Sequence, residues 1–282
     1  MQHYIDLSIV IPVYNSSDIL PTLVNQLEAV CATIAPLDRV EIILINDCSP
    51  DNSWPVIQEL AKTRSFLRGI SLRKNFGQHN ATMAGLNYAS GEVIIIMDDD
   101  LQHPPEALPK LLAKINEGYD VCYTHYQNRQ HATWKKLGSK FNNLVATSLL
   151  EKPRDLYLSS FKAIRREIAK EIIKYEGPYA YLDGLILNVT KSITSIDINH
   201  GARYIGTGNY NLRRSMSLWL KMATNFSIIP LRIATVMGFI LSITSLIMLI
   251  IVIIDKIIHP TISAGWASIM TAVLFIGGIQ TL

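Results

Sequence analysis

Three consecutive aspartates, Asp98, Asp99 and Asp100, follow an apolar run at 93–97. The run predicts a buried strand, so the carboxylates lie where that strand ends. In an extended strand alternate side chains share a face, and Asp98 and Asp100 would then form a pair of ligands for Mg²⁺ or Mn²⁺. The alternative is an acidic turn that caps the helix after Pro105, and the three residues alone do not separate the two.

The first 125 residues alternate predicted strands with predicted helices. We expect strands at 7–13, 40–45, 68–72, 93–97 and 120–123, with helices at 20–31, 51–63, 78–89 and 106–116. This alternation predicts an α/β fold with a doubly wound, mostly parallel sheet. Such sheets bind ligands at the carboxyl ends of their strands. Polar clusters follow the predicted strands at Tyr14–Asn15, Asn46–Asp47, Arg73–Asn75 and Asp98–Asp100.

The glycine pattern narrows the nucleotide chemistry. The first glycine is Gly69, so the first strand is followed neither by a G-x-G-x-x-G turn nor by a phosphate loop. This disfavours a dinucleotide oxidoreductase and a kinase-like nucleoside triphosphatase. A diphosphate bound here would need its charge neutralised by other means, and a metal ion on Asp98 and Asp100 would do so.

The last fifty residues predict membrane insertion. The runs 233–254 and 261–282 carry no charged residue, and each is long enough to cross a bilayer core of about 30 Å as a helix. Two helices buried in a soluble core are the alternative. From 200 to 232 there are five basic residues and no acidic one. The positive-inside rule then makes this flank cytoplasmic, and the two runs form a hairpin with both ends inside.

Charge and cysteine content disfavour a nucleic-acid-binding protein and a cysteine-ligated metal site. A net charge of +3 is too small to predict nucleic-acid binding, and basic and aromatic residues are not interleaved. Cys31, Cys48 and Cys122 lack metal-ligand spacing and suit a reducing compartment. No segment resembling a signal peptide opens the chain, so we expect the N-terminal part to stay in the cytoplasm.

Four segments resemble the successive motifs of glycosyltransferase family 2. They read IPVYN at 11–15, NDCSPD at 46–51, RKNFGQH at 73–79 and MDDDLQHPPE at 97–106. The resemblance continues through 210–214 and 225–232, which is typical of the polyisoprenyl-phosphate branch. It implies a catalytic domain of the GT-A fold at 1–210, an amphipathic interface helix at 211–232 and a transmembrane hairpin at 233–282. Relatives continue into a cytoplasmic tail, so we expect this chain to be a truncated form.

The resemblance also implies roles for individual residues. Asp98 and Asp100 would bind the metal ion, and Gln102 would lie next to the diphosphate or the donor sugar. The nucleotide sugar, with UDP favoured over GDP, would contact Pro12, Tyr14, Asn15, Asp47, Arg73, Asn75, Gln78, His79 and Asp98. The acceptor, a polyprenyl phosphate, would be held by Arg203, Arg213 and Arg214.

Two departures from the family pattern affect these roles. Asn46-Asp47-Cys48 replaces the usual two acidic residues and glycine, and Ser160 replaces an aspartate that many relatives carry before the position of Phe161. The second change removes the obvious catalytic base. Asp155 and Asp183 remain candidates, although Asp183 is as readily a structural hydrogen-bonding group. A lipid phosphate with a second pKa of about 6 is already an oxyanion at pH 7, so we expect no strong base to be needed.

The sequence therefore predicts an inverting, metal-dependent enzyme at the cytoplasmic membrane, multi-pass and, from its relatives, homo-oligomeric. It would transfer one sugar from a nucleotide donor to undecaprenyl phosphate for cell-envelope glycan modification. One alternative is a chain-extending family 2 enzyme with a glycan acceptor, but we find no Q-x-x-R-W motif. The other is a catalytically silent, membrane-tethered module that binds nucleotide sugars, which the retention of Asp98 and Asp100 disfavours.

Overall fold

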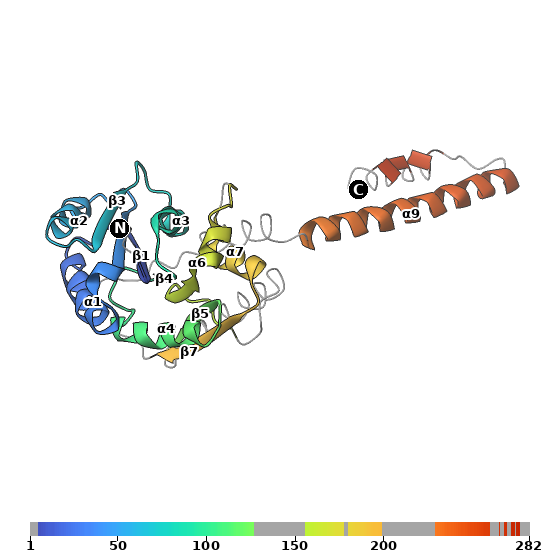
Figure 1. Cartoon of the computed structure of the whole chain (residues 1–282). Coiled ribbons are helices and arrows are strands. Elements are labelled where there is room, and N and C mark those ends of the chain that lie inside the picture. Colours follow the sequence, from blue (N-terminus) through green and yellow to red (C-terminus); the bar gives the residue numbers. More distant parts are fainter. Residues whose placement is uncertain are drawn as a thin grey trace. The chain divides into compact units, whose positions relative to one another are not determined.

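A seven-stranded sheet lies at the centre of the first of two units, Met1–Asn211 and Leu212–Leu282. The computed structural model describes residues 5–126, 156–177, 180–198 and 229–259, with scattered positions between 265 and 276. The sheet and its helices all belong to the first unit (Figure 1). In the second unit the described residues form one long helix.

The strands are β1 (Leu7–Val13), β2 (Val40–Asn46), β3 (Leu67–Ser71), β4 (Val93–Ile96), β5 (Val121–Tyr126), β6 (Lys162–Arg165) and β7 (Ile193–Ile198). Their order across the sheet is β3-β2-β1-β4-β6-β5-β7. Neighbours pair in parallel except at β6, which is antiparallel to both β4 and β5. The predicted mostly parallel α/β sheet is confirmed, and the reversed strand β6 and the edge strand β7 are additions to the five predicted strands.

Helices follow the strands along the chain. They are α1 (Leu20–Ile34), α2 (Ser53–Lys62), α3 (Gln78–Tyr88), α4 (Leu108–Asn116), α6 (Arg166–Ile172) and α7 (Leu182–Val189), with short 3₁₀ turns η1 (Leu37–Arg39) and η2 (Pro105–Ala107). Every residue of β1 is buried because helices cover both faces of the sheet. A strand buried on both sides reads as a continuous apolar run, which is how β1, β2 and β4 were recognised.

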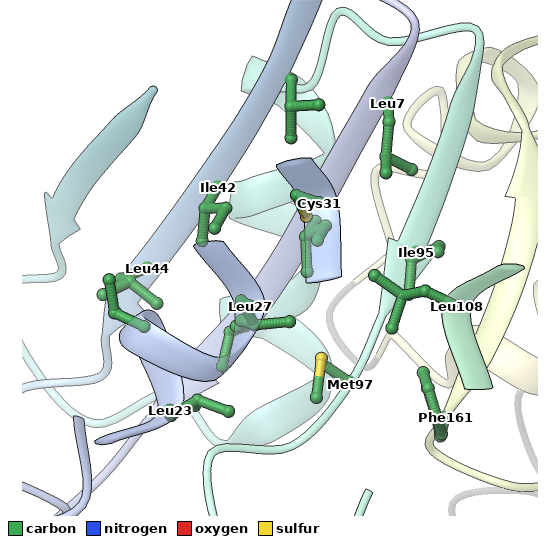
Figure 2. Close-up of a cluster of buried hydrophobic side chains, with 14 of the residues drawn as sticks. Leu7, Leu23, Leu27, Cys31, Ile42, Leu44, Ile95, Met97, Leu108 and Phe161 are labelled. Atoms are coloured by element: carbon green, nitrogen blue, oxygen red, sulfur yellow. The ribbon is translucent and has the colours of Figure 1, made fainter. Parts of the chain in front are cut away.

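The two faces of β1 are packed differently. Ile9 and Ile11 belong to a cluster that α1 and α4 complete, and Figure 2 shows Leu27, Met97 and Leu108 of this cluster. On the opposite face α3 approaches closely, because a Cβ added at Gly85 would lie 2.5 Å from Val10 Cγ1. Rigid packing on both faces holds the carboxyl ends of the strands in place.

The second unit contains α9 (Ile229–Ile258). Among the described residues, one stretch, Ala234–Asp255, is long and apolar enough to cross a membrane. Its side chains are largely open, as the 58% exposure of Ile251 illustrates. The helix α9 includes the first of the two apolar runs predicted to cross the membrane, 233–254. The second run, 261–282, is described only at scattered positions and most of the expected interface helix lies outside the described residues, so the hairpin and that helix stay predictions.

Candidate active site

The three aspartates lie in a turn beyond β4. The strand ends at Ile96, Met97 N still donates to Val10 O at 3.2 Å, and Leu101 has a positive φ of 59°. The expectation that strand alternation orients Asp98 and Asp100 is therefore wrong. In this turn each of the three carboxylates has different hydrogen-bond partners, and these partners determine which carboxylate oxygens remain available to a ligand.

Asp98 is held from two sides. Gln78 Nε2 donates to its Oδ1, and Ser160 Oγ donates to its Oδ2 at 2.6 Å. The side chain keeps 26% of its surface exposed. Each carboxylate oxygen has two lone pairs, so both oxygens can still accept a further ligand. Gln78, which the resemblance places at the nucleotide sugar, thus contacts the first aspartate directly.

Asp99 faces the end of β1 instead. Its Oδ2 accepts bonds from Ser16 Oγ at 2.6 Å and from Tyr14 N at 3.1 Å. Burial is the main cause that raises the pKa of Asp99 to about 6; the neighbouring carboxylates of Asp98 and Asp100 act in the same direction, and these two bonds oppose the shift. Asp99 therefore fastens the 14–16 loop to the aspartate turn. Sequence reasoning did not reveal this contact between Asp99 and Ser16, because no local pattern links positions 83 residues apart.

Asp100 is the least engaged of the three carboxylates. Its Oδ1 accepts a bond from Gln102 N at 3.1 Å, which closes the turn. In the described part of the chain no group of three or more His, Cys, Asp or Glu side chains could hold a metal ion alone. Mg²⁺ is commonly held by one or two carboxylates together with substrate phosphates and water, so Asp98 and Asp100 fit an ion that arrives with a diphosphate.

Asp47 supports the loop before α3. Its two oxygens accept bonds from Phe76 N and Gly77 N, each at 2.8 Å, and the residue is only 3% exposed. Gly77, the residue before α3, has φ 85°, a conformation that favours glycine. Cys48 also has a positive φ, 55°, at the position where the family usually carries glycine. The segment that follows β2 therefore keeps a left-handed backbone at position 48 without a glycine there.

The other residues expected at the nucleotide lie around the same edge. Tyr14 is half exposed, Asn15 N donates to Ser49 Oγ at 3.2 Å, and Arg73 and Asn75 are exposed on the loop that Asp47 supports. Pro12 is buried within β1, where it is paired in register with Ile45. These contacts leave their nucleotide-binding roles as predictions.

Asp183, at the start of α7, is part of a buried network. Its Oδ1 accepts bonds from Lys162 Nζ and from Tyr123 OH, the latter at 2.9 Å. Lys162 Nζ also lies 4.9 Å from the centre of the Tyr123 ring. Burial and the Asp183 charge raise the pKa of Tyr123 well above its usual value, so this phenol stays a donor. The contacts of Asp183 favour the structural role over that of a base.

His79 connects this network with the aspartate turn. Its ring packs edge-on against Tyr181 with centroids 5.3 Å apart. Burial lowers the pKa of His79, and Lys162 lowers it too, while Asp183 and Asp98 oppose the shift. His79 is therefore a neutral group at pH 7. Asp155 and the three arginines expected at the acceptor, Arg203, Arg213 and Arg214, lie outside the described residues.

Comparisons with known proteins agree with this geometry. The model of the glycosyl transferase family 2 matches residues 8–173. An undecaprenyl-phosphate 4-deoxy-4-formamido-L-arabinose transferase from Klebsiella pneumoniae subsp. pneumoniae is 33% identical over 270 residues, which cover 95% of this chain and 82% of the relative. A protein of the same description from Yersinia enterocolitica is 31% identical over the same shares.

Solved structures give the fold. Glucosyl-3-phosphoglycerate synthase from Mycobacterium tuberculosis, in complex with Mn²⁺, UDP-glucose and phosphoglyceric acid, superposes with a TM-score of 0.54. It shares 15% sequence identity, over 77% of this chain and 76% of that one. At this level the likeness concerns the backbone, and it confirms the expected GT-A fold.

Proposed function

Since the chain belongs to glycosyl transferase family 2, and is therefore a glycosyltransferase, we propose that it transfers one sugar from a nucleotide donor to undecaprenyl phosphate or a similar polyprenyl phosphate. The observation that carries this proposal is the extent of the likeness to undecaprenyl-phosphate transferases. It covers 95% of the chain, and so includes the C-terminal apolar part as well as the catalytic unit. A likeness confined to the catalytic unit would leave the acceptor open.

The donor is a nucleotide sugar, with UDP as the preferred nucleotide. The related synthase that was solved with UDP-glucose and Mn²⁺ supports this choice. Asp98 and Asp100 hold a divalent cation, Mg²⁺ or Mn²⁺, together with the donor diphosphate. When bound, such an ion neutralises the charge that develops on the departing diphosphate. Gln102, next in the same turn, lies at the diphosphate or the sugar.

The base and ribose lie at the edge formed by Tyr14, Asn15 and Asp47. Asp47 acts there through the loop it supports, because Phe76 N and Gly77 N already donate to its two oxygens. Arg73, on the same loop, is exposed and can approach the diphosphate. The rigid sheet beneath these loops holds the donor in one orientation.

The reaction inverts the donor carbon. An oxygen of the lipid phosphate forms a bond to that carbon while the bond to the nucleoside diphosphate breaks, and the diphosphate leaves on the opposite side. Arg203, Arg213 and Arg214 hold the incoming phosphate, since guanidinium groups match phosphate geometry with two parallel hydrogen bonds. The helix α9 and the run 261–282 anchor the enzyme, with the catalytic unit and these arginines on the cytoplasmic side.

The test uses the full chain in detergent with undecaprenyl phosphate and either Mg²⁺ or Mn²⁺. It is given a panel of UDP- and GDP-sugars that includes the UDP-activated 4-deoxy-4-formamido-L-arabinose. Mass spectrometry should detect one sugar added per lipid phosphate, and Asp100→Ala serves as the matched inactive control. Nucleotide-sugar binding without turnover on any donor, or transfer to a glycan in preference to the lipid, would overturn the proposal.

A further inference from the structure

Asp98 is enclosed by a closed series of hydrogen bonds that begins and ends on the residue itself. Its backbone N–H donates to His103 Nδ1 at 3.0 Å. The other ring nitrogen, Nε2, lies 3.4 Å from Ser160 Oγ, and Ser160 Oγ lies 2.6 Å from Asp98 Oδ2. Three polar groups from two distant segments of the chain, the Asp98 N–H, the His103 imidazole and the Ser160 hydroxyl, thus form one series that ends on the Asp98 carboxylate.

The direction of each bond in this series follows from the first. A backbone N–H can only donate, so His103 Nδ1 must accept and the ring proton is on Nε2. Nε2 therefore donates to Ser160 Oγ, which leaves the single hydroxyl proton of Ser160 for Asp98 Oδ2. The histidine fixes the orientation of the hydroxyl, and the hydroxyl fixes the orientation of the carboxylate.

Packing prevents the imidazole from turning. His103 is 5% exposed, and its ring stacks on Phe161 with centroids 5.0 Å apart and an interplanar angle of 12°. Phe161 is fully buried and directly follows Ser160 in the chain. The same short segment therefore supplies both the hydroxyl and the surface that holds the ring.

We propose that His103 and Ser160 are positioning residues that hold the Asp98 carboxylate in the orientation needed by the donor diphosphate and its metal ion. The inference rests on the proposed function. Gln78 holds the other oxygen of Asp98, so both oxygens have one lone pair committed and one left for the ligand. Partners of this kind stabilise metal-binding carboxylates, and their loss weakens metal affinity by about 10- to 100-fold.

The experiment measures Mn²⁺ binding by the full chain in detergent, with UDP present, from the electron paramagnetic resonance signal of free Mn²⁺. Ser160→Ala should weaken Mn²⁺ binding about tenfold. His103→Asn keeps an acceptor near Nδ1 and loses the Nε2 donor, so it should weaken binding in the same direction. The double variant should bind no more weakly than Ser160→Ala, because both changes act through one hydroxyl.

Ser159→Ala is the matched control. Its hydroxyl is also buried, but it accepts bonds from Thr124 Oγ1 at 3.0 Å and from Phe161 N at 3.2 Å and has no bond to Asp98. It should lower the melting temperature and leave Mn²⁺ affinity unchanged, whereas Ser160→Thr, which keeps the hydroxyl, should retain most of that affinity.

Two outcomes would overturn the inference while the proposed function stands. They are wild-type Mn²⁺ affinity in folded Ser160→Ala, and a double variant whose loss equals the product of the two single losses. A wild-type protein that binds no Mn²⁺ with UDP would instead refute the metal site of the proposed function, and this inference with it.

Discussion

Replacing Asp183 with asparagine removes the carboxylate charge that pairs with the buried ammonium of Lys162. Both residues have little contact with water, since Lys162 is 2% exposed and Asp183 is 7% exposed. The asparagine carbonyl can still accept the bond that Tyr123 OH donates at 2.9 Å. The substitution therefore changes the charge and keeps the shape and the main hydrogen bond.

Removing one partner of a buried ion pair costs about 3–5 kcal/mol, because the other charge is left buried without compensation. Asn keeps an acceptor for Lys162, so we expect the lower end, about 3 kcal/mol. For a unit of this size one kcal/mol shifts the melting temperature by about 2–4 °C, which gives a fall of about 6–12 °C. Adding Lys162→Met removes the unpaired ammonium and should recover most of the loss.

The effect on transfer separates the two roles of Asp183. A general base contributes about 10²- to 10⁴-fold to a rate, so its loss would be evident in a folded variant. We expect Asp183→Asn, assayed well below its melting temperature, to keep transfer within about tenfold of wild type, since the structural role does not touch the reacting atoms. A hundredfold loss in the folded variant would identify Asp183 as the base and refute this reasoning.

Further predictions concern the metal, the cysteines and the acceptor. Asp100→Ala should abolish transfer and leave the protein folded, and EDTA should abolish transfer reversibly; full turnover in a metal-free preparation would contradict both. Burial raises the pKa of Cys31 and of Cys122 to about 12, so at pH 8 only about 10⁻⁴ of each is thiolate. Iodoacetamide should therefore label the exposed Cys48 first, and equal labelling of all three in peptide mass spectra would disprove the burial argument. Arg203→Ala should raise the Km for lipid phosphate and leave the Km for the nucleotide sugar unchanged, and Arg203→Lys should recover part of the loss. An unchanged Km for lipid phosphate in detergent would exclude the proposal that Arg203 holds the acceptor phosphate.

Much of the fold could be predicted because its central strands are buried on both faces. β1 was placed at its observed ends and β2 within one residue, since their apolar runs are continuous and bounded by polar residues. β6 and β7 were not predicted. β6 has four residues, begins with Lys162 and ends with Arg165, and lies antiparallel between β4 and β5, so it depends on its neighbours and has no pattern of its own.

The site was predictable in its residue types and not in its contacts. The carboxylates and amides do follow the strands, as the rule for parallel sheets requires. Their partners come from far along the chain, such as Ser160, 62 positions from Asp98, and Phe76, 29 positions from Asp47. Which oxygen accepts which proton depends on the turn after β4, where Leu101 leaves the extended conformation. Strand alternation therefore gave the wrong geometry for these carboxylates.

The contacts of Ser160 and Asp183 bear on how the acceptor is activated. A hydroxyl acceptor needs a base to remove its proton, and family members commonly carry an aspartate where this chain has Ser160. Here the Ser160 hydroxyl donates a hydrogen bond to Asp98, and Asp183 accepts two hydrogen bonds in a buried network. Neither group is arranged to take a proton from a substrate. A phosphate monoester with a second pKa of about 6 is mostly a dianion at pH 7 and attacks without losing a proton. The arrangement of these two residues thus favours a lipid phosphate over a sugar hydroxyl as the acceptor.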